Sequence, residues 1–313
     1  MKLNPVNTAF VFPGQGSQAV GMGRELAQQY PAARSLFDQA DAALGFSLSA
    51  VMWEGPETNL NDTLNTQPAL FTHSMAALQV LKSLYPDFHP SILAGHSLGQ
   101  LSALCAGEAL AFRDGLLLVR RRGELMKRAG EANPGGMAAI LNLDIPTLER
   151  ICASASTVDE VVQVANDNCP GQVVISGAKA AVERAMALAK EAGARRALPL
   201  AVSIAAHSTL MASIQSDWDA AVSDAHVGDT QIPVIGNVSA QIMRTGAELR
   251  EDIQRQMQSR VRWTETIENT SAQGITTFVE LGTGTVLGGL IRRIASAAMA
   301  LPLGTPADFS ALQ

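Results

Sequence analysis

One serine in the chain has the setting that nucleophilic catalysis requires. Ser97 lies in Gly95-His96-Ser97-Leu98-Gly99, between the apolar stretch 92–94 and an alanine- and leucine-rich helical pattern. The order of strand, G-x-S-x-G and helix predicts a nucleophile elbow, a sharp turn that presents the serine oxygen at the start of a helix. The alternative for this motif is a glycine-rich turn whose serine only caps the helix.

A serine nucleophile needs a base, and the chain has five histidines. Four of them fall inside the elbow, in a predicted helix or in polar connections: His96, His73, His89 and His226. His207 follows the apolar stretch 197–202, predicted as a strand, and precedes the next helix. Because catalytic groups often occupy such strand ends, we predict that His207 is the base. A structural histidine is the alternative.

The glycine turn near the N-terminus is a second candidate site. Residues 14–19, GQGSQA, follow the predicted strand 8–12 and fit the G-x-G-x-x-G/A fingerprint of dinucleotide-binding loops. That fold needs a second strand and, about 20 residues on, an acidic residue for the ribose. Apolar residues between 22 and 44 recur instead at helical spacing, which places Asp38 and Asp41 on a predicted helix. The dinucleotide interpretation is therefore disfavoured.

The elements around these groups alternate between strands and helices, and the pattern changes in the middle of the chain. Segment 132–202 has the order βαββαβ, which predicts a ferredoxin-like small subdomain. Its predicted strands are 136–141, 161–165, 172–176 and 196–202, and its predicted helices are 146–154 and 180–192. Segments 1–131 and 203–313 then supply a discontinuous, α/β-hydrolase-like large domain with a parallel sheet.

Composition excludes several classes of protein. The 313 residues are 47% hydrophobic and 17% charged, which suits a globular protein with a sizeable core. A net charge of -6 without long runs of one sign disfavours a nucleic-acid binder or a membrane-surface protein. The three cysteines have no metal-binding spacing, and no apolar run is long enough for a signal peptide or a membrane span. We expect a cytoplasmic protein without a metal site.

Several segments, in order along nearly the whole chain, resemble malonyl-CoA:acyl carrier protein transacylases. They are FVFPGQGSQ (10–18), AGHSLG (94–99), RRGELM (121–126), PGQVVISG (170–177), RALPLAVSIAAH (196–207), and VRW (261–263) with ELGTGTVLGGLIRR (280–293). The resemblance implies that a malonyl group moves from CoA to the phosphopantetheine thiol of an acyl carrier protein. It also implies a monomer that needs no cofactor besides the CoA thioester substrate.

The same resemblance implies roles for the residues at the elbow. Ser97 would attack the thioester, and His207 would take the serine proton and return it to the leaving thiol. The backbone amides of Gln15 and Leu98 would form the oxyanion hole, which gives the N-terminal glycine turn a purpose other than pyrophosphate binding. The backbone carbonyl of Gln256 would orient His207.

Further family positions concern substrate and partner. Arg120, Arg121 and Arg122 point in different directions around a predicted helix, and the family pattern turns Arg122 toward the malonyl carboxylate. Asn166 would also line the site. The resemblance places docking of the acidic carrier protein at four arginines: Arg195, Arg196, Arg292 and Arg293.

Three positions depart from the family pattern. Gln100 stands in place of a glutamate, Arg260 in place of a proline, and Ala206 in place of serine or phenylalanine. None of them removes a group that the mechanism requires. Because residue 206 is small, acceptance of α-branched acyl groups such as methylmalonyl stays an open alternative.

The alternatives for function are a serine hydrolase or thioesterase with the same Ser97–His207 pair, a non-catalytic carrier-binding scaffold, and the malonyl-loading subunit of malonate decarboxylase. For a transferase, fatty-acid and polyketide synthesis both remain possible.

Overall fold

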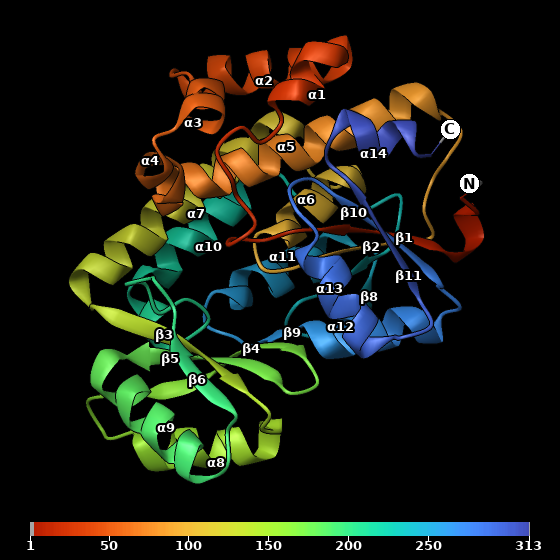
Figure 1. The fold of residues 1–313 in the computed structure, drawn as a ribbon. Helices are drawn as coiled ribbons and strands as arrows, with labels where there is room; N and C mark the ends of the chain where they lie inside the picture. Colours follow the sequence, from red (N-terminus) through yellow and green to blue (C-terminus); the bar gives the residue numbers. More distant parts are fainter. Residues whose placement is uncertain (1–2, 313) are drawn as a thin grey trace.

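Six strands form the larger sheet of the computed structural model, which describes residues 3–312 (Figure 1). Their order is β11-β10-β1-β2-β7-β8, in which neighbours pair in parallel as far as β7, and β8 runs antiparallel to it. The strands are β1 (Thr8–Phe12), β2 (Ile92–Gly95), β7 (Val234–Ile235), β8 (Ile242–Met243), β10 (Thr277–Leu281) and β11 (Met299–Leu303).

Helices cover both faces of this sheet (Figure 1). All of β1 is buried, and its side chains alternate between two cores. Phe10 and Phe12 face a core that includes α5, α6 and α7, whereas Ala9 and Val11 face a second core built with α12 and α13. Burial on both faces explains the continuous apolar run TAFVF.

The helices of this larger part are α1 (Arg24–Gln29), α2 (Pro31–Leu44), α3 (Leu48–Glu54), α4 (Glu57–Asn61), α5 (Thr63–Leu84), α6 (Gly99–Ala106), α7 (Phe112–Ala132), α10 (Gln215–Asp224), α11 (Gly246–Gln256), α12 (Trp263–Ala272), α13 (Val286–Ile294) and α14 (Pro306–Ser310). Two 3-10 turns, η1 (Pro5–Asn7) and η2 (Thr209–Ile214), complete the set. Between β1 and β2 the described chain is helical, which leaves no second strand for a dinucleotide fold.

A second sheet of five strands has the order β6-β3-β5-β4-β9. Its elements are β3 (Gly135–Leu141), α8 (Ile145–Ala155), β4 (Val162–Cys169), β5 (Gln172–Ala178), α9 (Lys179–Glu191), β6 (Arg196–Pro199) and β9 (Val261–Arg262). Strands β3 to β6 pair antiparallel and share a core with α8 and α9, which gives the ferredoxin-like order. The two sheets confirm the predicted fold class.

The small sheet is extended by a strand from outside the predicted subdomain. β9 comes from the C-terminal part of the chain and pairs in parallel with β4, at Asn166↔Val261 and Asp167↔Arg262. The domain boundaries at 131/132 and 202/203 stay a prediction.

Two strands near the candidate site differ in length from their prediction. β6 ends at Pro199 and not at residue 202, because the N–H of Val202 bonds to the carbonyl of Leu200 (2.8 Å) in a tight turn. β4 continues past the predicted residue 165 to Cys169, with register shifts on both sides of the 166–167 pair. Such irregularities re-aim side chains, and here they lie beside Asn166.

The carboxyl ends of three neighbouring parallel strands bring the candidate residues together. Gln15 follows β1, Ser97 follows β2, and Asn237 follows β7. Glycines allow the first two loops to touch: a Cβ on Gly14 would lie 2.5 Å from the carbonyl oxygen of His96, and one on Gly99 would lie 2.0 Å from that of Phe12. The sheet therefore fixes where the two motifs meet.

Candidate active site

Ser97 and His207 form a hydrogen-bonded pair. Ser97 Oγ lies 2.8 Å from His207 Nε2, although 110 residues separate them. On the other side of the ring, His207 Nδ1 lies 2.9 Å from the backbone carbonyl of Gln256. Since a carbonyl only accepts hydrogen bonds, Nδ1 carries the proton and Nε2 is free to accept one from the serine.

Both residues of this pair have a positive φ, 52° for Ser97 and 58° for His207. This left-handed conformation is uncommon for residues other than glycine, and such strain costs on the order of 1–3 kcal/mol per residue. At Ser97 it produces the sharp turn between β2 and α6 that the elbow motif predicted.

Burial keeps His207 in its basic form. The side chain is almost fully buried next to the Arg122 guanidinium, and burial, followed by this charge, lowers the pKa of His207 to about 3. A pKa below the working pH leaves the imidazole neutral and able to accept a proton. The imidazolium formed in a reaction would be destabilised for the same reasons, which favours return of the proton.

Asn237, which the sequence analysis missed, forms hydrogen bonds with the backbone of the elbow. Asn237 Oδ1 accepts the backbone N–H of Ser97 (2.7 Å), and Asn237 Nδ2 donates to the carbonyl of Gly95 (2.7 Å). The side chain is fully buried, so these bonds do not compete with water. Asn237 therefore stabilises the strained turn that carries Ser97.

Two backbone N–H groups are available as an oxyanion hole. Within residues 3–312, the N–H groups of Gln15 and Leu98 have no hydrogen-bond partner. The side chain of Gln15 anchors its loop, because Gln15 Oε1 accepts a hydrogen bond from Thr63 Oγ1 (3.2 Å). Leu98 follows Ser97 at the start of α6, where free N–H groups favour negative charge.

Arg122 is buried beside the serine without a counter-ion. Its guanidinium donates to Gln67 Oε1 (2.9 Å), Gln256 Oε1 (2.9 Å) and Ser97 Oγ (3.2 Å). Its Nε is buried without a hydrogen-bond partner, and no ion pair in residues 3–312 includes this arginine. Burial lowers the pKa of Arg122 to about 10, so it remains charged at neutral pH. A buried cation with free donors is a site for an anion.

These groups border one cleft of about 650 Å³. Of the residues predicted for the site, five line it: Gln15, Ser97, Arg122, Asn166 and His207. Leu98 and Gln256 are buried behind its wall. A second wall comes from residues 200–204, the turn after β6, and from Ala206.

None of the four arginines predicted for docking lines this cleft, but they gather at one end of the small sheet. Leu141 of β3 pairs with Arg196 on one side and with Gln172 on the other. Arg293 then donates to Gln172 Oε1 (2.5 Å), which places Arg293 at the same end of the small sheet as Arg196. We call Arg195, Arg196, Arg292 and Arg293, all exposed, the arginine patch.

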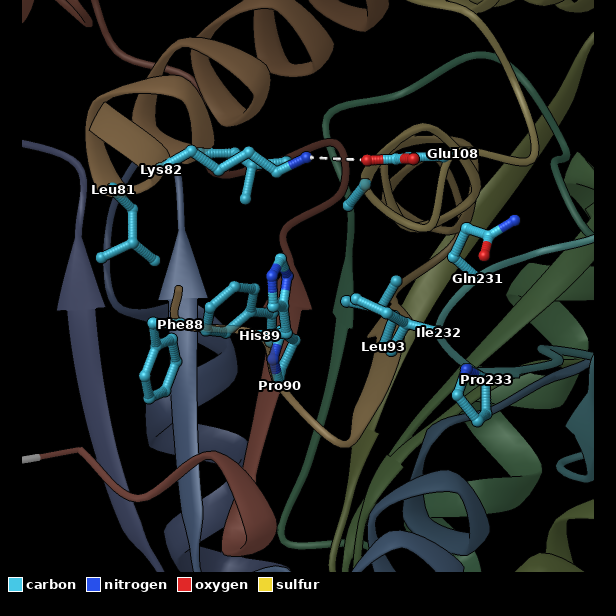
Figure 2. Close-up of a pocket in the computed structure, with 13 residues that line it drawn as sticks. Leu81, Lys82, Phe88, His89, Pro90, Leu93, Glu108, Gln231, Ile232 and Pro233 are labelled. Carbon is cyan, nitrogen blue, oxygen red and sulfur yellow. Dashed lines mark hydrogen bonds and ion pairs between the residues drawn. The ribbon is translucent and has the colours of Figure 1, made fainter. Parts of the chain in front are cut away.

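A further pocket, of about 470 Å³, lies at the other end of the large sheet (Figure 2). Leu93 and Pro233, at the amino ends of β2 and β7, form part of its wall. Figure 2 shows Lys82 directed at Glu108, with which it forms an ion pair (3.3 Å). Its lining includes His89 but no serine, threonine or cysteine, so this pocket lacks a hydroxyl or thiol nucleophile.

Residues 3–312 contain no group of three or more His, Cys, Asp or Glu side chains that is placed to hold a metal ion. In the same range, no helix is both long enough and apolar enough to cross a membrane.

Sequence reasoning missed three polar residues that support the site: Gln67, Asn237 and Asp252. The Asp252 carboxylate accepts hydrogen bonds from Gln100 Nε2 (2.8 Å) and from the backbone N–H of Asn237 (2.9 Å). Gln67 and Asp252 lie inside helices, where nothing in the local pattern separates them from surface residues. Asn237 did carry a signal, because it follows a buried strand at the same sheet edge as Ser97.

Comparisons with known proteins agree with the motifs. The acyl transferase domain family matches residues 9–298. The malonyl CoA-acyl carrier protein transacylase of Bacillus subtilis is 46% identical over 288 residues, which cover 91% of this chain and 90% of that protein. The crystal structure of an acyl carrier protein S-malonyltransferase from Vibrio cholerae has a TM-score of 0.95 at 42% identity, over 98% of this chain and 100% of that one.

A solved complex also matches. It contains a type II PKS acyl-carrier protein with its malonyl-transacylase, and the match has a TM-score of 0.94 at 40% identity over 98% of both chains. The chain therefore belongs to the malonyl-CoA:acyl carrier protein transacylase family.

Proposed function

We propose that this protein moves a malonyl group from malonyl-CoA to the phosphopantetheine thiol of an acyl carrier protein through an ester on Ser97. In the first half, Ser97 Oγ attacks the thioester carbon while its proton passes to His207 Nε2. The carbonyl oxygen becomes an oxyanion that the N–H groups of Gln15 and Leu98 stabilise. The C–S bond then breaks, and His207 returns the proton to the sulfur of CoA.

The second half runs through the same groups in reverse order. His207 takes the proton of the carrier thiol, whose sulfur attacks the Ser97 ester. The ester C–O bond breaks, and the proton moves to Ser97 Oγ. Ser97 and His207 supply nucleophile and base, so the proposed reaction uses no cofactor besides the CoA thioester substrate. We further propose that the protein works as a monomer in the cytoplasm.

The observation that best supports this function is that the Arg122 guanidinium, beside Ser97 Oγ, has no counter-ion within residues 3–312. The guanidinium has five N–H donors. Three of them donate the hydrogen bonds described above, and two have no partner in the same range. A malonyl group esterified to Ser97 carries a free carboxylate that can form a charge pair with this guanidinium. An acetyl group offers no such partner, so Arg122 favours the dicarboxylic substrate.

We also propose that the acyl carrier protein docks at the arginine patch. Carrier proteins of this family are acidic, and the patch supplies exposed positive charge on a protein of net charge -6. Arg196 lies four residues before Leu200 of the cleft wall, a separation of about 13 Å along an extended chain. A carrier bound there would direct its phosphopantetheine arm into the cleft.

The test of the proposed function is an intact-mass measurement after mixing with malonyl-CoA. The wild-type protein should gain one malonyl group that persists until carrier protein or CoA is added, because the acyl-enzyme awaits a thiol. Ser97→Ala should gain none and keep its fold, because the half-exposed hydroxyl contributes little packing. Rapid loss of the adduct in buffer alone would favour a hydrolase, and a malonyl adduct on Ser97→Ala would exclude Ser97 as the nucleophile.

Arg122→Ala should change which acyl group is loaded. Removing one member of a buried charge pair costs on the order of 2–5 kcal/mol, so malonyl loading should fall by at least about 30-fold. Acetyl loading should fall much less, and the ratio of the two rates is the measurement. Arg121→Ala is the matched control, because Arg121 is an exposed neighbour paired with Glu124. An unchanged ratio in Arg122→Ala would rule out the selectivity role.

Charge reversal in the arginine patch should separate the two half-reactions. In Arg195→Glu/Arg196→Glu, transfer to the carrier protein should slow and lose most of its salt dependence, because electrostatic attraction mainly sets the association rate. Loading of Ser97 from malonyl-CoA should stay near the wild-type rate. Arg150→Glu on α8 is a control for a single charge reversal at an exposed position. Equal slowing of both half-reactions would contradict a docking role.

A further inference from the structure

A chain of buried hydrogen bonds runs from Asp252 on α11 to Arg122. Gln100 Nε2 donates to Asp252 Oδ1 (2.8 Å), and Gln256 Nε2 donates to Gln100 Oε1 (2.5 Å). Gln256 Oε1 in turn accepts from the Arg122 guanidinium (2.9 Å). The chain thus joins a group that only accepts to a group that only donates, through two amides.

The acceptor at one end fixes how Gln100 is turned and, through Gln100, favours one orientation of Gln256. A side-chain amide can rotate by half a turn and exchange its C=O and NH2 groups. Because the Asp252 carboxylate has no proton to donate, Gln100 turns its NH2 group toward it and its oxygen toward Gln256. Gln256 turns its NH2 group toward Gln100 and the backbone carbonyl of Ser97 (3.0 Å), and its oxygen toward the guanidinium.

Burial makes the orientation of the two amides important. The exposed fractions are 5% for Asp252, 0% for Gln100, 2% for Gln256 and 2% for Arg122, so water does not replace a lost partner. If Gln256 presented its NH2 group to Arg122, two donors would face each other in a dry site. The guanidinium would then lose an acceptor that helps to hold it beside Ser97.

We propose that Asp252 is a positioning residue that sets the selectivity for a dicarboxylic acyl group. It acts through Gln100 and Gln256, which present an acceptor to Arg122 and hold the guanidinium where the substrate carboxylate arrives. This inference rests on the proposed function. Asp252 also accepts the backbone N–H groups of Asn237 (2.9 Å) and Ser239 (3.0 Å), so it contributes to stability as well.

The experiment must therefore separate positioning from stability. Asp252→Asn keeps the shape of the side chain but removes its negative charge and one of its two acceptor oxygens, which weakens the acceptor that fixes Gln100. Gln100→Glu in the same chain restores a group that only accepts, now next to Gln256. The measurement is the ratio of malonyl to acetyl loading rates on Ser97, with thermal unfolding followed in parallel.

Asp252→Asn should lower this ratio by on the order of tenfold, the loss expected for one hydrogen bond to a charged group. The double variant Asp252→Asn/Gln100→Glu should recover the ratio to within about threefold of wild type, even if it stays less stable. A simple structural role predicts a lower unfolding temperature with an unchanged ratio. That result, or a lowered ratio that Gln100→Glu does not restore, overturns the inference.

Controls complete the design. Asp144→Asn makes the same change at an exposed carboxylate that caps α8, and should leave the ratio unchanged. If Asp252→Asn does not fold, Gln100→Ala decides, because it breaks the same chain of hydrogen bonds and leaves Asp252 in place: a lowered ratio supports the inference, and an unchanged ratio overturns it. Failure of wild-type protein to retain malonate on Ser97 would instead overturn the proposed function, which keeps the two failures distinct.

Discussion

The active site depends on a guanidinium that is buried without a counter-ion. Removing a charge from water is costly, and within residues 3–312 the cost is offset only by hydrogen bonds to the neutral oxygens of Gln67, Gln256 and Ser97. These acceptors come from α5, from α11 and from the elbow, so the packing of all three around α7 is arranged to meet one cation. A substrate carboxylate would complete the charge pair that the protein leaves open.

This constraint explains why a backbone carbonyl orients His207, the proposed base. Gln256 meets His207 through its main-chain oxygen and Arg122 through its side-chain oxygen, so one residue holds both groups with neutral acceptors. A carboxylate in the same place would bind Arg122 and compete with the substrate. The same cation and the same burial lower the pKa of His207, which keeps the base neutral and ready to accept the serine proton.

Much of the fold followed from local sequence patterns. The buried run TAFVF, the helical spacing from residue 22 to 44 and the βαββαβ order all matched, because periodicity and glycine turns report local geometry. The G-x-S-x-G motif located the elbow for the same reason. The predicted end of β6, at residue 202, was wrong. The residues after Pro199 remain apolar, as in a strand, but they turn to line the cleft.

Residues whose role depends on tertiary contacts were harder to find. Asp252 reaches Gln100 across 152 positions and Gln67 reaches Arg122 across 55, and neither pairing has a local signal. The family resemblance pointed to Gln256 as the position whose carbonyl orients His207, but not to its second contact with Arg122. Nor did the sequence indicate that β9 would extend the small sheet.

The central claim is that the carboxylate of the substrate completes the charge pair of Arg122. It is tested most directly by a crystal structure of the protein with malonate esterified to Ser97. The account predicts that a carboxylate oxygen lies about 2.8 Å from a guanidinium nitrogen of Arg122, with Gln67 and Gln256 still bound to that side chain. A malonyl carboxylate that points into solvent, with Arg122 still unpaired, would contradict it.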